Sequence, residues 1–123
     1  MKKILIVEDE IAYVKLLRTR LEFNYKVLDA SNGQDGLKIA KKEHPDLILL
    51  DIIMPIMDGM AMLKELRKDH WGKDAKVILL TNLEASDKIV AQVTTDLPIY
   101  YFVKSDVKLD DLLDKIYGLV PAN

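Results

Sequence analysis

Cysteine is absent from this sequence of 123 residues, which excludes disulfides, zinc–thiolate sites and thiol nucleophiles. The absence of disulfides fits a reducing compartment. The net charge is only −2 at pH 7, so no strongly basic surface indicates a nucleic acid as the partner. The apolar run near the start, residues 4–7, ends at Glu8 and is too short for a signal-peptide core or a membrane span. We therefore predict a cytoplasmic protein that binds neither nucleic acid nor membrane through this chain.

The composition that is present is that of a globular domain. Half of the residues are apolar and 31% are charged, an ordinary balance for a folded domain. A chain of this length can bury roughly two-thirds of its unfolded surface, so it needs no disulfide to fold. The sequence has no internal repeat, low-complexity tract or linker. We expect one domain over residues 1–123 with no output domain in this chain.

Short apolar runs alternate with longer segments of helical period. The runs are continuously apolar, as in parallel strands that are covered on both faces. They are residues 4–7, 27–30, 47–50, 77–80 and 99–103. Between and after them, apolar residues recur at steps of three and four, which predicts five helices. The residues that mark these helices are Ile11, Val14, Leu17 and Leu21; Leu37 and Ala40; Met60, Leu63 and Leu66; Ile89, Val90 and Val93; and Leu109, Leu112, Leu113 and Ile116.

Two helix starts carry candidate capping residues. Asp58 is placed to cap the third helix, and Ser105 or Asp106 the fifth. The alternation of strands and helices predicts an α/β fold, a doubly wound, five-stranded parallel sheet with helices on both faces. The expected strand order is 2-1-3-4-5, in which ligands bind at the carboxyl ends of the strands, beside the point where the order reverses.

Candidate site residues follow the first, third, fourth and fifth predicted strands. They are Glu8, Asp9 and Glu10 after the first, Asp51 after the third, Thr81 after the fourth and Lys104 after the fifth. Neighbouring carboxylates repel one another unless a cation is present, and oxygen ligands suit Mg²⁺. Asp51 lies on the central strand of this group and could attack phosphorus as a carboxylate nucleophile. Lys104 and Thr81 could then supply a charge and a hydroxyl donor to phosphoryl oxygens.

The segments that carry these residues resemble the receiver domains of bacterial two-component response regulators. They read Ile-Val-Glu-Asp-Glu at residues 6–10, Leu-Leu-Asp-Ile-Ile-Met-Pro-Ile-Met-Asp-Gly at 49–59, Leu-Leu-Thr at 79–81 and Tyr-Phe-Val-Lys at 101–104. The resemblance spans the whole chain and implies a flavodoxin-like fold. It implies that Asp51 is the phosphoacceptor. Glu8, Asp9 and Asp51 would hold Mg²⁺ together with the backbone carbonyl of Ile53.

The same resemblance implies a switch and its partners. Thr81 and Lys104 match the residues that bind the phosphoryl group, and Tyr101 matches the aromatic that turns inward on activation. The resemblance implies a phosphorelay in which a sensor histidine kinase or a histidine phosphotransfer protein supplies the phosphoryl group. The domain would catalyse only its own phosphotransfer and dephosphorylation. A downstream protein would bind the face made by the fourth helix, fifth strand and fifth helix, and dimerisation is open.

Several positions depart from the family pattern. Ser105 stands where the family has proline in a cis peptide bond, which leaves that bond open because a non-proline cis bond costs about 3 kcal/mol. Asn82 is larger than the usual residue, and residues 94–98 lack the usual Gly-Ala. Ile53 and Leu83 are apolar at positions that influence hydrolysis in the family, so we expect a long-lived phosphoryl state.

Three alternatives remain beside this interpretation. A degenerate receiver could act as a binding platform without phosphorylation. A flavin mononucleotide carrier would need a Ser/Thr/Gly-rich phosphate loop after the first strand, where this chain has three acids. A Mg²⁺-dependent phosphatase with an aspartate nucleophile would carry Asp-x-Asp there, and Glu8-Asp9-Glu10 does not fit that pattern.

Overall fold

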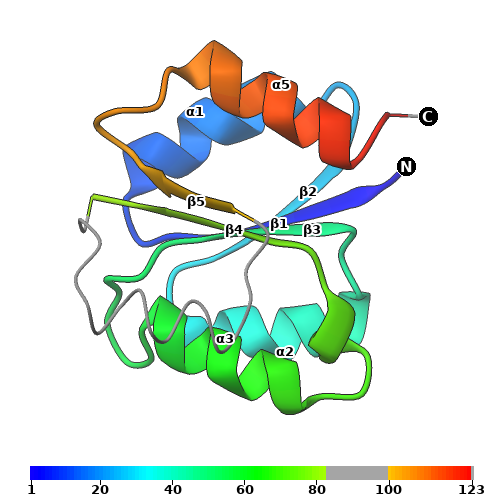
Figure 1. Cartoon of the computed structure of the whole chain (residues 1–123), viewed down its shortest axis with the longest axis vertical. Helices are drawn as coiled ribbons and strands as arrows, with labels where there is room; N and C mark the ends of the chain where they lie inside the picture. The colour runs from blue at the N-terminus through cyan, green and yellow to red at the C-terminus, as the bar shows by residue number, and fades with distance from the viewer. Residues whose placement is uncertain (83–99, 123) are drawn as a thin grey trace.

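The computed structural model describes residues 1–82 and 100–122, and for Thr81 only the backbone. It contains a five-stranded parallel sheet in the order β2-β1-β3-β4-β5, which confirms the predicted order (Figure 1). The strands are β1 (Lys3–Val7), β2 (Lys26–Ala30), β3 (Leu47–Leu50), β4 (Val77–Thr81) and β5 (Tyr100–Val103). Each differs from its predicted run by at most one residue at either end.

Helices cover both faces of the sheet. In the described ranges they are α1 (Ile11–Leu21), α2 (Gly33–Glu43), α3 (Gly59–Lys68) and α5 (Leu109–Leu119), with a 3₁₀ turn η1 (Gly72–Asp74). Helices α1 and α5 lie on one side of the sheet, and α2 and α3 lie on the other (Figure 1). The fourth helix, predicted around Ile89, falls outside the described residues, as do Leu83 and residues 94–98. None of the helices in the described part is long and apolar enough to cross a membrane.

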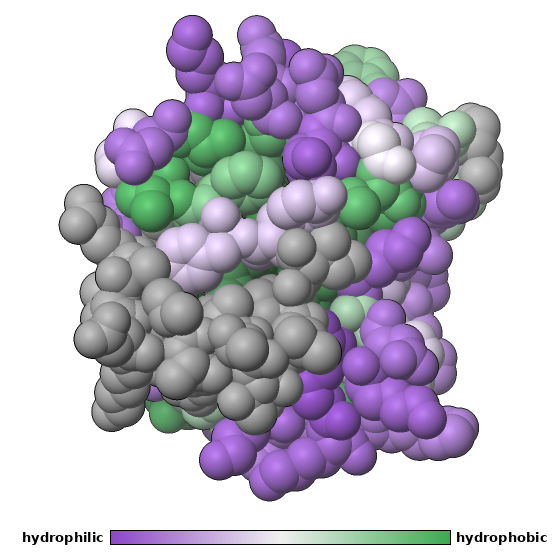
Figure 2. Space-filling view, viewed as in Figure 1, coloured by the Kyte–Doolittle hydropathy of each residue, from purple (hydrophilic) through white to green (hydrophobic). Residues whose placement is uncertain are grey.

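Two hydrophobic cores, one on each side of the sheet, explain the continuous apolar runs. Ile4 and Ile6 of β1 pack with α1 and α5, whereas Leu5 and Val7 of the same strand pack with α2 and α3. All four side chains are at most 1% exposed. Hydrophilic side chains cover much of the outer surface of the helices, and hydrophobic surface shows between helices and sheet (Figure 2). Burial on both faces is the physical reason for the continuous pattern.

The register of the sheet aligns the strand ends. Val7 pairs with Ala30 and with Leu50, and Leu50 pairs with Leu79. The residues directly after β1 and β3 are also held by the ladder. The backbone N–H of Glu8 donates to the Ala30 carbonyl at 2.9 Å, and that of Asp51 to the Val7 carbonyl at 3.0 Å. The polar residues that follow these strands therefore start from one edge of the sheet.

One of the two predicted helix caps is correct. Asp58 precedes α3, and its carboxylate accepts a hydrogen bond from the backbone N–H of Ala61 at 2.8 Å. The prediction for the fifth helix was wrong, because α5 begins at Leu109 after Lys108, which makes no side-chain cap. Asp106 instead lies in a turn, where its N–H donates to the Val103 carbonyl at the end of β5.

The buried stripe of α1 also differs from the prediction. Ile11 was expected to face the core but is 70% exposed. Leu17 and Leu21 are buried as expected, and Tyr13 packs against the same core. Val14 packs there as predicted, so the stripe keeps steps of three and four, and Tyr13 rather than Ile11 is its first member.

Candidate functional site

Three carboxylates meet at the carboxyl edge of the sheet. Glu8 and Asp9 follow β1, and Asp51 follows β3. One oxygen of each lies within 4.8 Å of the others, so the group could hold a metal ion. Glu8 is 4% exposed and Asp51 is 8% exposed, whereas Asp9 is exposed. The cluster is thus buried on the sheet side and accessible from Asp9.

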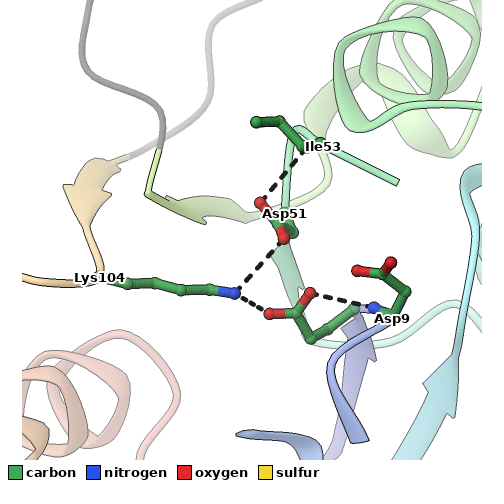
Figure 3. A network of polar contacts seen from close by, with 5 residues as sticks. Asp9, Asp51, Ile53 and Lys104 are labelled. Atoms are coloured by element: carbon green, nitrogen blue, oxygen red, sulfur yellow. Dashed lines mark hydrogen bonds and ion pairs between the residues drawn. The ribbon is translucent and has the colours of Figure 1, made fainter. Parts of the chain in front are cut away.

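Backbone N–H groups fix two of these carboxylates. Glu8 Oε2 accepts a hydrogen bond from the N–H of Asp9 at 3.0 Å. Asp51 Oδ1 accepts from the N–H of Ile53 at 3.4 Å, which leaves Oδ2 directed towards Lys104 (Figure 3). Ile53 therefore borders the site through its backbone, while its side chain is 60% exposed.

Lys104 reaches the acids from the turn after β5. Its Nζ forms an ion pair with Glu8 Oε1 and lies 3.4 Å from Asp51 Oδ2 (Figure 3). Its side chain is 8% exposed. Burial lowers the pKa of Lys104 below its ordinary value, whereas the two carboxylates favour the charged amine. A lysine predicted from its place after an apolar strand is thus brought together with the acids.

The remaining predicted residues lie around this cluster. Thr81 is the last residue of β4 and pairs with Val103, which places its backbone at the same edge. Tyr101 is partly buried in β5 and packs against the core formed with α2 and α3. Asn82 and Ser105 are exposed. The Lys104–Ser105 peptide bond is trans.

Tyr13 belongs to the site although the sequence analysis did not single it out. Lys104 Nζ lies 4.6 Å from the centroid of the Tyr13 ring. Burial raises the pKa of Tyr13 to about 12, and the negative charges of Glu10 and Asp51 act in the same direction. The spacing of Tyr13 from Leu17 and Leu21 was the one signal that could have revealed it.

Among the described residues, the charges of the cluster do not balance. Three carboxylates face one ammonium group there, so an ionised cluster carries an excess of negative charge. Such a site attracts a divalent cation, and a ligand set of oxygens alone suits Mg²⁺. The residues present therefore fit this ion.

Comparison with known proteins gives one consistent family. A model described as the response regulator receiver domain matches residues 4–117. The regulatory protein KdpE of the KDP operon in Escherichia coli is 37% identical over 120 residues, which are 97% of this chain and 47% of that protein. A probable transcriptional regulator, ycf27 of Porphyra purpurea, is 44% identical over 90 residues, 72% of this chain and 36% of that protein. The chain thus spans less than half the length of these curated relatives.

Solved structures agree with the observed topology. A CheY-like receiver domain from Methanospirillum hungatei superposes with a TM-score of 0.86 at 32% identity, covering 96% of this chain and 92% of that one. The chemotaxis protein CheY4 of Vibrio cholerae gives a TM-score of 0.85 at 26% identity, with 98% and 99% covered. Both comparisons extend across nearly the whole chain.

Proposed function

Because the chain belongs to the response regulator receiver domain family, we propose that it is a phosphorylation-controlled signalling switch that accepts a phosphoryl group on Asp51. One observation carries this proposal. The buried Asp51 carboxylate lies among two further acids and within 3.4 Å of the Lys104 ammonium, at the carboxyl edge of a parallel sheet. A carboxylate in this setting can act as a nucleophile whose product is stabilised by the neighbouring cation.

Glu8, Asp9 and Asp51 would hold Mg²⁺, together with the backbone carbonyl of Ile53. The ion would neutralise the carboxylates and bind oxygens of the incoming phosphoryl group. Asp9 is exposed, so an ion or a phosphoryl donor can enter the site from the side of its carboxylate. This assignment uses only hard oxygen ligands, as Mg²⁺ prefers.

The residues around Asp51 prepare it for attack. One oxygen is held by the Ile53 N–H, and the other faces Lys104. As an Asp51 oxygen bonds to phosphorus, the donor's bond to phosphorus breaks and its leaving group takes the electron pair. Lys104 then offsets the charge on the phosphoryl oxygens. Binding and positioning of this kind supply most of the catalysis in phosphoryl transfer.

Thr81 and Tyr101 would report the change to the rest of the domain. The Thr81 hydroxyl would bind the phosphoryl group, and Tyr101 would turn inward, altering the face of β5 and α5. A new charge that biases a two-state element is a general form of switching. A sensor histidine kinase or histidine phosphotransfer protein in the cytoplasm would supply the phosphoryl group, and that face would bind the downstream protein or a second copy.

Intact mass spectrometry after incubation with acetyl phosphate or phosphoramidate tests this function. We expect a gain of one phosphoryl group in the presence of Mg²⁺, no gain with EDTA, and no gain in the Asp51→Asn variant. Asp74→Asn is a matched control, because Asp74 is an exposed acid in η1, which precedes the amino end of β4. It should gain the group as the wild type does.

Two results would contradict the proposal. Equal phosphorylation of Asp51→Asn would place the acceptor elsewhere. Absence of modification with either donor, in a folded protein with Mg²⁺, would favour a binding platform that works without phosphorylation.

A further inference from the structure

We propose that Tyr13 is a positioning residue for Lys104, with the face of its ring holding the Lys104 ammonium group beside Asp51. The inference rests on the proposed function, because it concerns how the lysine is presented to the phosphoacceptor. It gives a role in the site to Tyr13, which lies within α1 and not directly after a strand.

The contact geometry is that of a cation held on an aromatic face. Lys104 Nζ lies 4.6 Å from the ring centroid, within the range of about 6 Å over which the ring quadrupole attracts a cation. The ring is a third contact for this ammonium, in addition to the ion pair with Glu8 and the approach to Asp51. The lysine is therefore held by the residues directly after β1 and β3 and by a residue of α1.

The ring itself is fixed by packing. Tyr13 lies one helical turn before the buried Leu17 and contacts the core between the sheet and α1 and α5. It also lines a small cavity of about 10 Å³ together with Glu8 and Asp51. Tyr13 and both acids thus border the same small space. The Tyr13 ring is partly buried and the Lys104 side chain is only 8% exposed, and burial of this kind strengthens the attraction between a cation and a ring.

The phenol is neutral throughout the physiological range. Burial raises the pKa of Tyr13 to about 12, with Glu10 and Asp51 adding to the effect. The attraction therefore comes from the ring face and not from a phenolate. A phenylalanine would keep it, and a leucine would not.

A neutral partner has a different effect from the acids. Glu8 and Asp51 are needed for other contacts when a metal ion or phosphoryl group arrives, and each competes for the ammonium group. The ring binds neither metal nor phosphate and leaves both carboxylates available. Without it, the nearer carboxylate of Glu8 is the dominant partner of Lys104, and the ammonium group moves away from Asp51.

The test compares Tyr13→Phe and Tyr13→Leu with the wild type. The rate of phosphorylation by acetyl phosphate in Mg²⁺ is one measurement, and the NMR shift of the Lys104 ε-methylene protons is the other. Tyr100→Leu is a matched control, because it removes a similar contact in which Lys115 Nζ lies 4.4 Å from the Tyr100 ring. Thermal unfolding of each variant establishes that it is folded.

We expect Tyr13→Leu to phosphorylate about fivefold to tenfold more slowly than the wild type, and Tyr13→Phe to stay within about twofold of it. The ring current over Lys104 should persist in Tyr13→Phe and disappear in Tyr13→Leu. Tyr100→Leu should leave the rate and the Lys104 shift unchanged.

Several outcomes would overturn the inference. Wild-type rate in a folded Tyr13→Leu variant would show that the ring does not position Lys104. Equal slowing in Tyr13→Phe would assign the effect to the hydroxyl. If the wild type itself is not phosphorylated, the proposed function fails, and the Lys104 shifts still decide whether Tyr13 holds the lysine.

Discussion

Ile56 has a backbone conformation that β-branched residues rarely adopt. Its φ is 68°, and its side chain is 79% exposed. The N–H of Met57 donates to the Pro55 carbonyl at 2.7 Å, which closes a γ-turn around Ile56. The Met57 carbonyl in turn accepts from the N–H of Gly33 at 2.8 Å, so the start of α2 holds the turn in place. The loop after Asp51 therefore stores local strain.

Glycine at this position should relieve the strain. Ile56→Gly removes a steric cost of roughly 1–2 kcal/mol from the folded state. Glycine also gives the unfolded chain more conformational freedom, which lowers the free energy of unfolding by roughly 0.5–1 kcal/mol. We expect a net increase of up to about 1 kcal/mol in the free energy of unfolding, measured by urea denaturation. Ile56→Ala keeps the strained Cβ and should show no increase. A less stable glycine variant would contradict this account of the turn.

Individual residues differ in whether the sequence alone could predict their place in the structure. Asp51, Glu8 and Lys104 were predictable because each follows an apolar strand, and parallel strands end at a common edge. Tyr13 was not predicted, because it lies within a helix and its contact with Lys104 depends on how α1 crosses the sheet. The positive φ of Ile56 could not be predicted, because isoleucine is a residue that rarely adopts this conformation.

At the level of elements, the start of α3 packs tightly against the backbone of Asp51 and Ile52, which directly follow β3. Gly59 is the first residue of α3, and its N–H donates to the Ile52 carbonyl at 2.8 Å. A Cβ on Gly59 would lie 1.9 Å from the backbone carbonyl oxygen of Asp51. The absence of a side chain on Gly59 thus sets how closely the helix approaches the site.

Two glycine-to-alanine changes in helices should have opposite effects. Gly59→Ala forces the backbone of Asp51 to move, and we expect a loss of about 3 kcal/mol in the free energy of unfolding together with slower phosphorylation. Gly118 lies in α5. Apart from its two chain neighbours and the backbone of its own helix, no described atom comes within 4 Å of the position that a Cβ would take there. Gly118→Ala should therefore add about 0.5–1 kcal/mol. Denaturant unfolding of both variants measures the contrast. Equal effects would mean that helix propensity alone governs both positions.

Elements were predicted well where hydrophobic periodicity is strong and less well at their ends. The run of residues 47–50 gave the bounds of β3 because its flanking residues are polar. The start of α5 was misplaced because Ser105 and Asp106 are residue types common at helix N-caps. In the structure they lie in a turn, in which the N–H of Asp106 donates to the Val103 carbonyl. Ile11 was misassigned because its side chain lies on the exposed side of α1, whereas Tyr13, two positions later, packs against the core.

At the level of the whole molecule, the strand order could be predicted because few arrangements of the strands are possible. Five apolar runs separated by helical segments require crossovers, and the right-handed rule leaves a small number of arrangements. The placement of the acids then followed from the order. What the sequence could not give is their distance from one another, which depends on the register between β1 and β3.

Binding of Mg²⁺ should stabilise the entire fold if the three acids hold it. A ligand that binds only the folded state at ten times its dissociation constant adds about 1.4 kcal/mol. We expect the midpoint of thermal unfolding to rise with Mg²⁺ in the wild type and in Asp74→Asn, and to rise much less in Asp9→Asn. Chelation with EDTA should reverse the rise. An equal rise in Asp9→Asn would exclude its carboxylate as a ligand.

Glu8 and Asp51 directly follow strands β1 and β3, which are interior strands of the sheet. β1 lies between β2 and β3, and β3 lies between β1 and β4. The amide hydrogens of Glu8 and Asp51 are themselves bonded to neighbouring strands. Amides in such positions exchange with solvent only when most of the domain opens. Glu8 and Asp51 therefore belong to the part of the protein that unfolds last. Partial opening under heat or denaturant will leave them in place while it loosens the periphery of the domain.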